Sequence, residues 1–116
     1  MNELTSRAQN NLVTETNRLD QNPAAVYLAG LAPSSRRTMQ NALDIIAQIG
    51  LGDENATCWD IPWQRLRFQH TQALRSTLAD RYAHSTANRM LSALRGVLKA
   101  AWKLELMTAE EYHDWM

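Results

Sequence analysis

The stretch that decides the fold is residues 85–104, STANRMLSALRGVLKAAWKL. Apolar side chains recur in it at three- and four-residue spacing, which is typical of the buried face of an amphipathic helix. The members of this face are Ala87, Leu91, Leu94, Leu98, Ala101 and Trp102. Ser85 is suited to cap the start of the helix. We therefore expect a long helix from Ser85 to about Leu104, with one side packed in a core.

Two further helices are predicted before this stretch. Asn22 and Pro23 offer an N-cap and a proline at the first helical position, and they predict a short helix over residues 24–31. A longer helix is expected from the serines at 34–35 until Gly50, where the apolar pattern ends. The apolar residues of that pattern are Met39, Ala42, Leu43, Ile46 and Ile49.

The remaining segments predict two more helices. After the turn-rich residues 50–61, Pro62 favours a helix start, and the pattern continues to Tyr82. The apolar stripe expected there is Trp63, Leu66, Ala73, Leu74, Leu78 and Tyr82. Thr108 and Glu111 have the spacing of a capping box and predict a last helix. The packing residues of that helix are expected to be Tyr112 and Trp115.

No segment sustains the alternation of a strand, so we expect an all-α fold, a small bundle of four to five helices. A chain of 116 residues suits one core, and we assign it to residues 22–116. Residues 1–21 are expected to be a polar leader, either a frayed helix or a disordered segment.

Composition restricts the classes of function. The single Cys58 cannot form an intramolecular disulfide, and no apolar run reaches the length of about 18 residues that a membrane span needs. We expect a cytoplasmic protein without a membrane partner. The formal net charge of zero hides an uneven distribution, because residues 34–103 carry ten Lys and Arg against five Asp and Glu. A basic middle segment is compatible with nucleic acid.

Candidate chemistry is sparse. The histidines stand far apart in the sequence, at His70, His84 and His113, so no metal site is expected. Cys58 lies in a polar loop without a surrounding motif, and we interpret it as a structural thiol. No phosphate-binding glycine motif or acid–base constellation is present. We therefore predict no cofactor and no enzymatic activity in this chain.

Polar residues gather at the starts of two predicted helices. Ser35, Arg36, Arg37 and Thr38 combine hydroxyl and guanidinium groups at one helix start, and residues 85–89 repeat the combination at another. Such groups suit phosphate contacts and base edges in the major groove. Considered singly, each start also fits an ordinary serine cap with solvated arginines. The candidate DNA-binding residues are Ser35, Arg36, Arg37, Thr38, Asn41, Ser85, Thr86, Arg89, Arg95, Lys99 and Lys103.

These two segments resemble a known family, the N-terminal core-binding (SAM-like) domain of phage-type tyrosine recombinases and integrases. Residues 35–38 before an apolar helix look like its first long DNA-facing helix, and residues 85–95, STANRMLSALR, look like its "Leu-Ser-Ala-Leu-Arg" helix. The resemblance spans about residues 22–115. It implies a domain that clamps duplex DNA for integration or recombination, while a separate C-terminal domain, absent here, cuts the strand. It also implies a bacterial or phage origin and a parent protein that can be oligomeric on DNA.

Two features depart from the family pattern. Family members tend to be more basic overall, and the segment 50–61 is longer than the resemblance implies. The alternative interpretation is a helical protein–protein interaction module, in which Trp59, Trp63 or Trp115 docks a partner helix.

Overall fold

The computed structural model describes residues 21–114, and this part of the chain contains helices and no strand. The elements are α2 (Pro23–Ala29), α3 (Pro33–Leu51), the 3-10 helix η1 (Trp63–Arg65), α4 (Phe68–Arg81), α5 (His84–Lys103) and α6 (Ala109–Asp114). The all-α class and the small helical bundle are confirmed. The predicted leader, apart from Gln21, and the predicted packing residue Trp115 lie outside the described residues.

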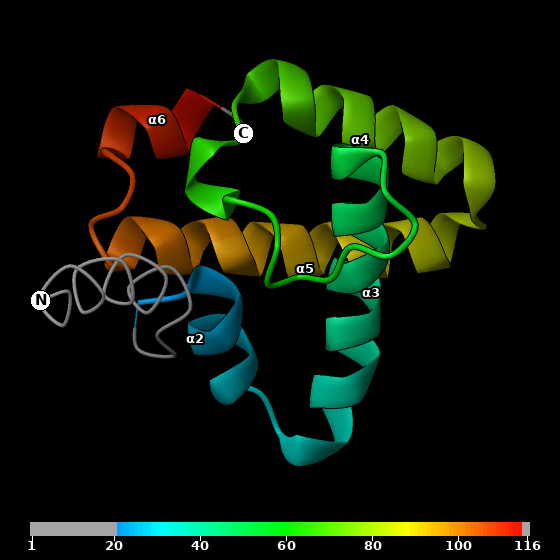
Figure 1. Cartoon of the computed structure of the whole chain (residues 1–116), viewed down its shortest axis with the longest axis horizontal. Helices are drawn as coiled ribbons and strands as arrows, with labels where there is room; N and C mark the ends of the chain where they lie inside the picture. Colours follow the sequence, from blue (N-terminus) through cyan, green and yellow to red (C-terminus); the bar gives the residue numbers. More distant parts are fainter. Residues whose placement is uncertain (1–20, 115–116) are drawn as a thin grey trace, which may run out of the picture.

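Helix α5 is the centre of the bundle. It contacts α2, α3, α4, α6 and η1, and Figure 1 shows it running across the molecule with α3 crossing it and α4 on one side. The sequence explains this position, because its apolar face is the longest in the chain. The core side chains of α5 include Leu94, Val97 and Leu98, each at most 1% exposed. Helix α5 therefore carries the shared core while its opposite face stays in solvent.

Most predicted core residues are buried or half-buried, but two are exposed. Leu43 and Ile46 of α3 and Leu78 of α4 are fully buried, as their spacing predicts. Trp102, expected on the buried side of α5, is 37% exposed, and its ring stacks on Tyr112 at a centroid distance of 5.1 Å. Ala73, expected in the stripe of α4, is also exposed. Ala73 lies off the buried face of α4, which is formed by Thr71, Leu74 and Leu78. Trp102 is covered only in part, by the ring of Tyr112.

The serines predicted to cap α3 and α5 lie inside these helices. The N-cap residues are Ala32 and Ala83, neither of which has a side-chain cap bond. Pro33 takes the first position of α3, where the fixed φ of proline fits a helix. The predicted end of α3 at Gly50 is also wrong: the helix continues to Leu51, and Gly52 ends it at φ 65°, a left-handed conformation that favours glycine.

The predicted helix from Pro62 to Tyr82 is interrupted. Its first turn is the 3-10 helix η1, and Leu66 and Arg67 are extended before α4 begins at Phe68. The break lets Trp63 bury its ring to 1% exposure while its Nε1 donates to the Cys58 carbonyl at 2.9 Å. Burial of a large ring with its N–H satisfied outweighs helix continuity here.

The loop between α3 and η1 is tied to α3 by polar contacts. The Cys58 backbone N–H donates to Asp44 Oδ1 at 2.8 Å, and Gln48 Nε2 donates to the Ala56 carbonyl at 3.2 Å. Ala56 and Cys58 are buried. The second half of the turn-rich segment, residues 56–61, is therefore anchored to the bundle, while residues 51–55 are exposed.

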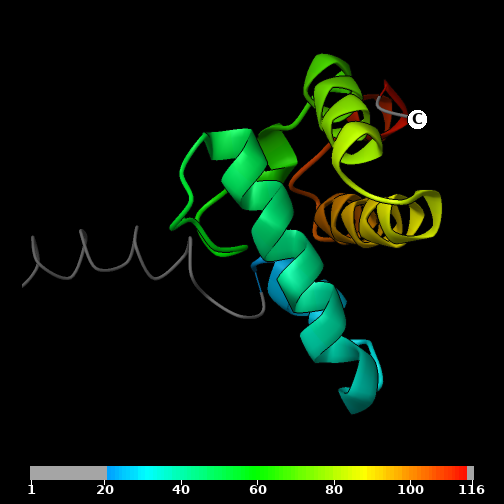
Figure 2. The same ribbon diagram turned by 90° about the vertical axis from the view of Figure 1, so that its right-hand side faces the viewer.

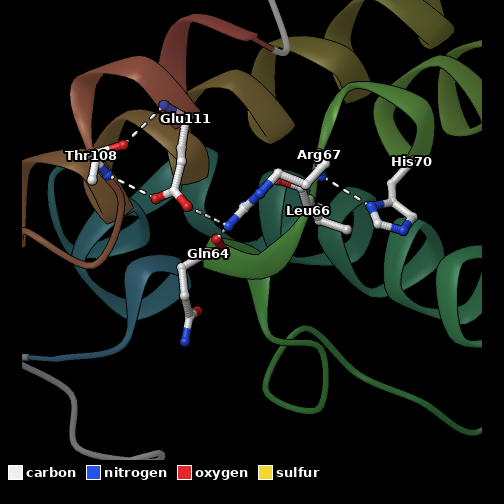
Figure 3. A network of polar contacts seen from close by, with 6 residues as sticks. All are labelled: Gln64, Leu66, Arg67, His70, Thr108 and Glu111. Atoms are coloured by element: carbon white, nitrogen blue, oxygen red, sulfur yellow. Dashed lines mark hydrogen bonds and ion pairs between the residues drawn. The ribbon is translucent and has the colours of Figure 1, made fainter.

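Helix α6 is held by the network in Figure 3. Arg67 donates from Nη1 to the carbonyls of Gln64 and Leu66, and from Nη2 to Glu111 Oε2 at 2.7 Å. Glu111 also accepts from the Thr108 N–H at 2.9 Å, and Thr108 Oγ1 accepts from the Glu111 N–H at 3.0 Å. The predicted capping box is confirmed, and Arg67 links it to the start of α4.

Candidate nucleic-acid interface

The outward face of α5 is a stripe of polar and positively charged side chains. Helix α5 contains four Lys and Arg residues and no Asp or Glu. Its exposed polar residues are His84, Ser85, Asn88, Arg89, Ser92, Arg95, Lys99 and Lys103. None of the four cations has an ion pair in the part of the chain that the structure describes. The face opposite the core therefore carries only positive charges and is free to contact an anion.

The first turns of α3 expose a second group. Ser35, Arg37, Thr38 and Asn41 are all exposed, in agreement with the side of the helix that the sequence assigns to solvent. Two of them, Thr38 and Asn41, lie close to one turn apart, so their side chains share a face. This end of α3 therefore offers hydroxyl, amide and guanidinium donors together.

Arg36 has a structural role that the sequence did not indicate. Its Nε donates to the carbonyls of Leu28 and Leu31 at 3.1 Å each, and its Nη2 donates to the Ala29 carbonyl at 3.2 Å. The Leu28 and Ala29 carbonyls belong to the end of α2, where helix geometry leaves acceptors without partners, and Leu31 lies in the link between α2 and α3. Arg36 thus fastens α2 to α3, and we leave it out of the proposed phosphate contacts.

The start of α5 differs in detail from its prediction. Ser85 is exposed in the first turn, while Thr86 is half-buried. His84 opens the helix, and its Nε2 lies 3.1 Å from Asn88 Nδ2. Thr86 is thus less accessible than a groove contact requires, and Ser85, Asn88 and Arg89 are the accessible groups of this turn.

The structure keeps the two helix starts apart. In Figure 1 the first turn of α3 lies at the bottom of the molecule and that of α5 at the right, and Figure 2 separates them again. They do not form one compact site. A long ligand such as duplex DNA is needed to reach both groups.

A hollow of about 350 Å³ lies between α4 and α5. Its lining includes Arg75 of α4 together with His84, Asn88 and Arg95 of α5, and no Asp or Glu. The Nε of Arg75 is buried and has no hydrogen-bond partner among residues 21–114. The sequence pattern did not indicate Arg75 or His84, because only the packing of α4 on α5 brings them beside Arg95.

The other candidate groups favour structural roles. Cys58 is fully buried, and burial together with the nearby Asp44 carboxylate raises its pKa to about 12. Tyr27, Tyr82 and Tyr112 pack against the core. Residues 21–114 hold no group of three or more His, Cys, Asp or Glu positioned to bind a metal. Within the same range, no helix is both long and apolar enough to cross a membrane.

No protein-family model, curated protein or solved structure matches this chain. Function is therefore inferred from the residues and their geometry.

Proposed function

We propose that this domain binds double-stranded DNA, and that it acts as the core-binding domain of a tyrosine recombinase whose strand-cutting chemistry belongs to a separate domain. The observation that carries the proposal is the outward face of α5. Arg89, Arg95, Lys99 and Lys103 all lie on the solvent side of a helix without a carboxylate. DNA carries closely spaced negative charges, and such a row of cations gains affinity by displacing the counterions around it.

The two groups of donors have different proposed tasks. Arg37, Thr38, Asn41 and Arg89 are short or forked side chains near helix starts, and they suit base edges in the major groove. Ser35, Arg95, Lys99 and Lys103 are proposed to contact phosphates, which fix position without reading sequence. Because the two helix starts lie apart, the proposal requires the duplex to span both.

Titration of labelled duplex DNA, followed by fluorescence anisotropy, tests this proposal. Binding whose affinity falls steeply as salt is raised supports it. A domain that stays unbound at low salt, up to the highest protein concentration, overturns it.

One observation favours the alternative, a protein–protein interaction module. Trp59 is 36% exposed and lines a shallow groove of about 580 Å³ with apolar residues of α2, among them Val26 and Leu28. A partner helix with an apolar face fits such a lining. Trp63, the other described tryptophan of this alternative, is buried and is not available as an anchor. Salt-insensitive binding of a helical peptide with no binding to DNA would favour this module.

A further inference from the structure

We propose that the hollow between α4 and α5 is a binding site for a phosphate group, held chiefly by Arg75 and Arg95. The phosphate is carried either by the backbone of DNA or by a phosphate monoester. If the phosphate belongs to DNA, the site rests on the proposed function. If the phosphate belongs to a free monoester, the site is independent of the proposed function.

The charge of the hollow favours an anion. Two guanidinium groups from different helices line it, and its lining contains no carboxylate. Within residues 21–114, the side chains of Arg75 and Arg95 have no ion pair and no hydrogen bond. Like charges that share a concave surface repel each other, so the arrangement is stabilised by an anion between them.

The environment of Arg75 also favours a bound anion. Its side chain is half-buried, and its Nε is shielded from solvent without an acceptor in the described chain. A buried donor that lacks a partner costs free energy, and such a group calls for a physical explanation. A phosphate at the terminal nitrogens of Arg75 compensates the charge that is delocalised over the whole guanidinium. Arg and phosphate also match in geometry, because two parallel N–H groups meet two oxygens.

Two further side chains of the lining add donors. Asn88 lies within hydrogen-bond distance of His84, at 3.1 Å, and both residues line the hollow. An amide and an imidazole supply N–H groups beside the two arginines. The rest of the lining is largely apolar and comes from Ala79, Tyr82, Ala87 and Leu91. The volume of about 350 Å³ is at the small end of ligand sites.

The site has one DNA test and one free-phosphate test. In the first, duplex DNA is titrated with wild type, Arg75→Met and the control Arg65→Met, whose exposed arginine lies on η1. Methionine keeps an unbranched apolar stem and removes the charge. We expect Arg75→Met to weaken binding several-fold and to lower the salt slope by about one unit, with Arg65→Met close to wild type.

In the second test, millimolar inorganic phosphate is added to 15N-labelled wild type at constant ionic strength. The Nε–Hε resonance of Arg75 is expected to shift and saturate, and chloride at the same ionic strength is expected to leave it unchanged. Phosphate is also expected to raise the Tm of wild type more than that of Arg75→Met, since a ligand stabilises the state that binds it. If Arg75→Met does not fold, Arg95→Met, whose side chain is exposed, replaces it in the comparison with inorganic phosphate, because the proposed function already places Arg95 on a DNA phosphate.

The outcomes separate the two proposals. A phosphate shift at Arg75 without DNA binding supports the hollow as a monoester site and overturns the proposed function. If wild type binds DNA and Arg75→Met binds it more weakly than Arg65→Met does, both the proposed function and the phosphate site are supported. DNA binding unchanged in Arg75→Met, together with no phosphate shift, overturns the hollow as a phosphate site and leaves the proposed function standing.

Discussion

The ring of Tyr27 on α2 lies directly over Gly96 of α5. A β-carbon at Gly96 would stand 2.1 Å from Tyr27 Cε1, far inside van der Waals contact. Helix α2 therefore approaches α5 closely only because residue 96 has no side chain. This contact joins the N-terminal part of the described chain to the central helix.

Gly96→Ala is expected to destabilise the domain by about 1–3 kcal/mol, the usual cost of overpacking. Urea unfolding measures the change. Gly30→Ala is the matched control, because its nearest contact would be 3.5 Å, an ordinary packing distance. If Gly96→Ala is as stable as wild type, the close packing of α2 on α5 is contradicted.

Cys58 is expected to react slowly with thiol reagents in the folded domain. Its side chain is fully buried, and its pKa is raised to about 12, chiefly by burial and further by Asp44. At pH 8 almost none of it is the reactive thiolate. Reaction with an aromatic disulfide reagent should accelerate sharply in denaturant. A folded protein that reacts as fast as the unfolded chain would contradict the structure.

The attachment of α6 is expected to weaken in acid. The Thr108 N–H donates to the Glu111 carboxylate, and Arg67 adds a nearby positive charge. Together they lower the pKa of Glu111 below its ordinary value. Because the pKa of Glu111 is lower in the folded state, its ionised carboxylate stabilises the fold at pH values above the ordinary pKa of glutamate. This stabilisation is lost as the pH falls through the lowered pKa.

Tryptophan fluorescence measures this transition, because Trp102 stacks on Tyr112 of α6. Glu111→Gln removes the titrating group and is the matched variant. Wild type should lose the stacking signal in acid, and Glu111→Gln should lack that transition. An identical acid midpoint in the two proteins would show that Glu111 does not control the attachment.

Local sequence signals predicted the elements more accurately than their ends. Asn22 was predicted as the N-cap of α2, and its Oδ1 accepts from the N–H groups of Ala24 and Ala25. The break before α4 was not predictable, because it depends on the burial of Trp63 in the core and on its bond to the Cys58 carbonyl of the preceding loop. Helix periodicity reports which face is apolar, but not where tertiary contacts interrupt the helix.

In the candidate site, too, the sequence predicted the features that depend on spacing within one helix but not those that depend on contacts between helices. The exposed stripe of α5 follows from spacing alone, and the structure places those side chains in solvent. The task of Arg36 at the end of α2 and the hollow around Arg75 both arise from contacts between helices. Such contacts leave no periodic signal in the sequence of either helix.

Lys99→Ala is expected to weaken DNA binding evenly across DNA sequences and to lower the salt slope by about one unit, as the loss of one phosphate contact does. Lys99 is exposed near the middle of the charged face of α5. Titrations of two unrelated duplexes at several salt concentrations measure both quantities. A loss confined to one duplex would contradict a phosphate role.

Arg37→Ala and Arg89→Ala are each expected to weaken DNA binding without unfolding the domain. Both side chains are exposed and have no polar partner in the described chain, so their removal leaves the core intact. Unchanged unfolding curves provide the control for stability. Normal DNA affinity in both variants would remove the main support for the groove contacts.

DNA binding through the charged face of α5 is tested most directly by the affinity of wild type for labelled duplex DNA at about 50 and 200 mM salt. If Arg95, Lys99 and Lys103 contact phosphates, this change in salt should weaken binding by about fortyfold. No binding at either salt concentration, or an affinity that does not change between them, would contradict a DNA-binding role for this face.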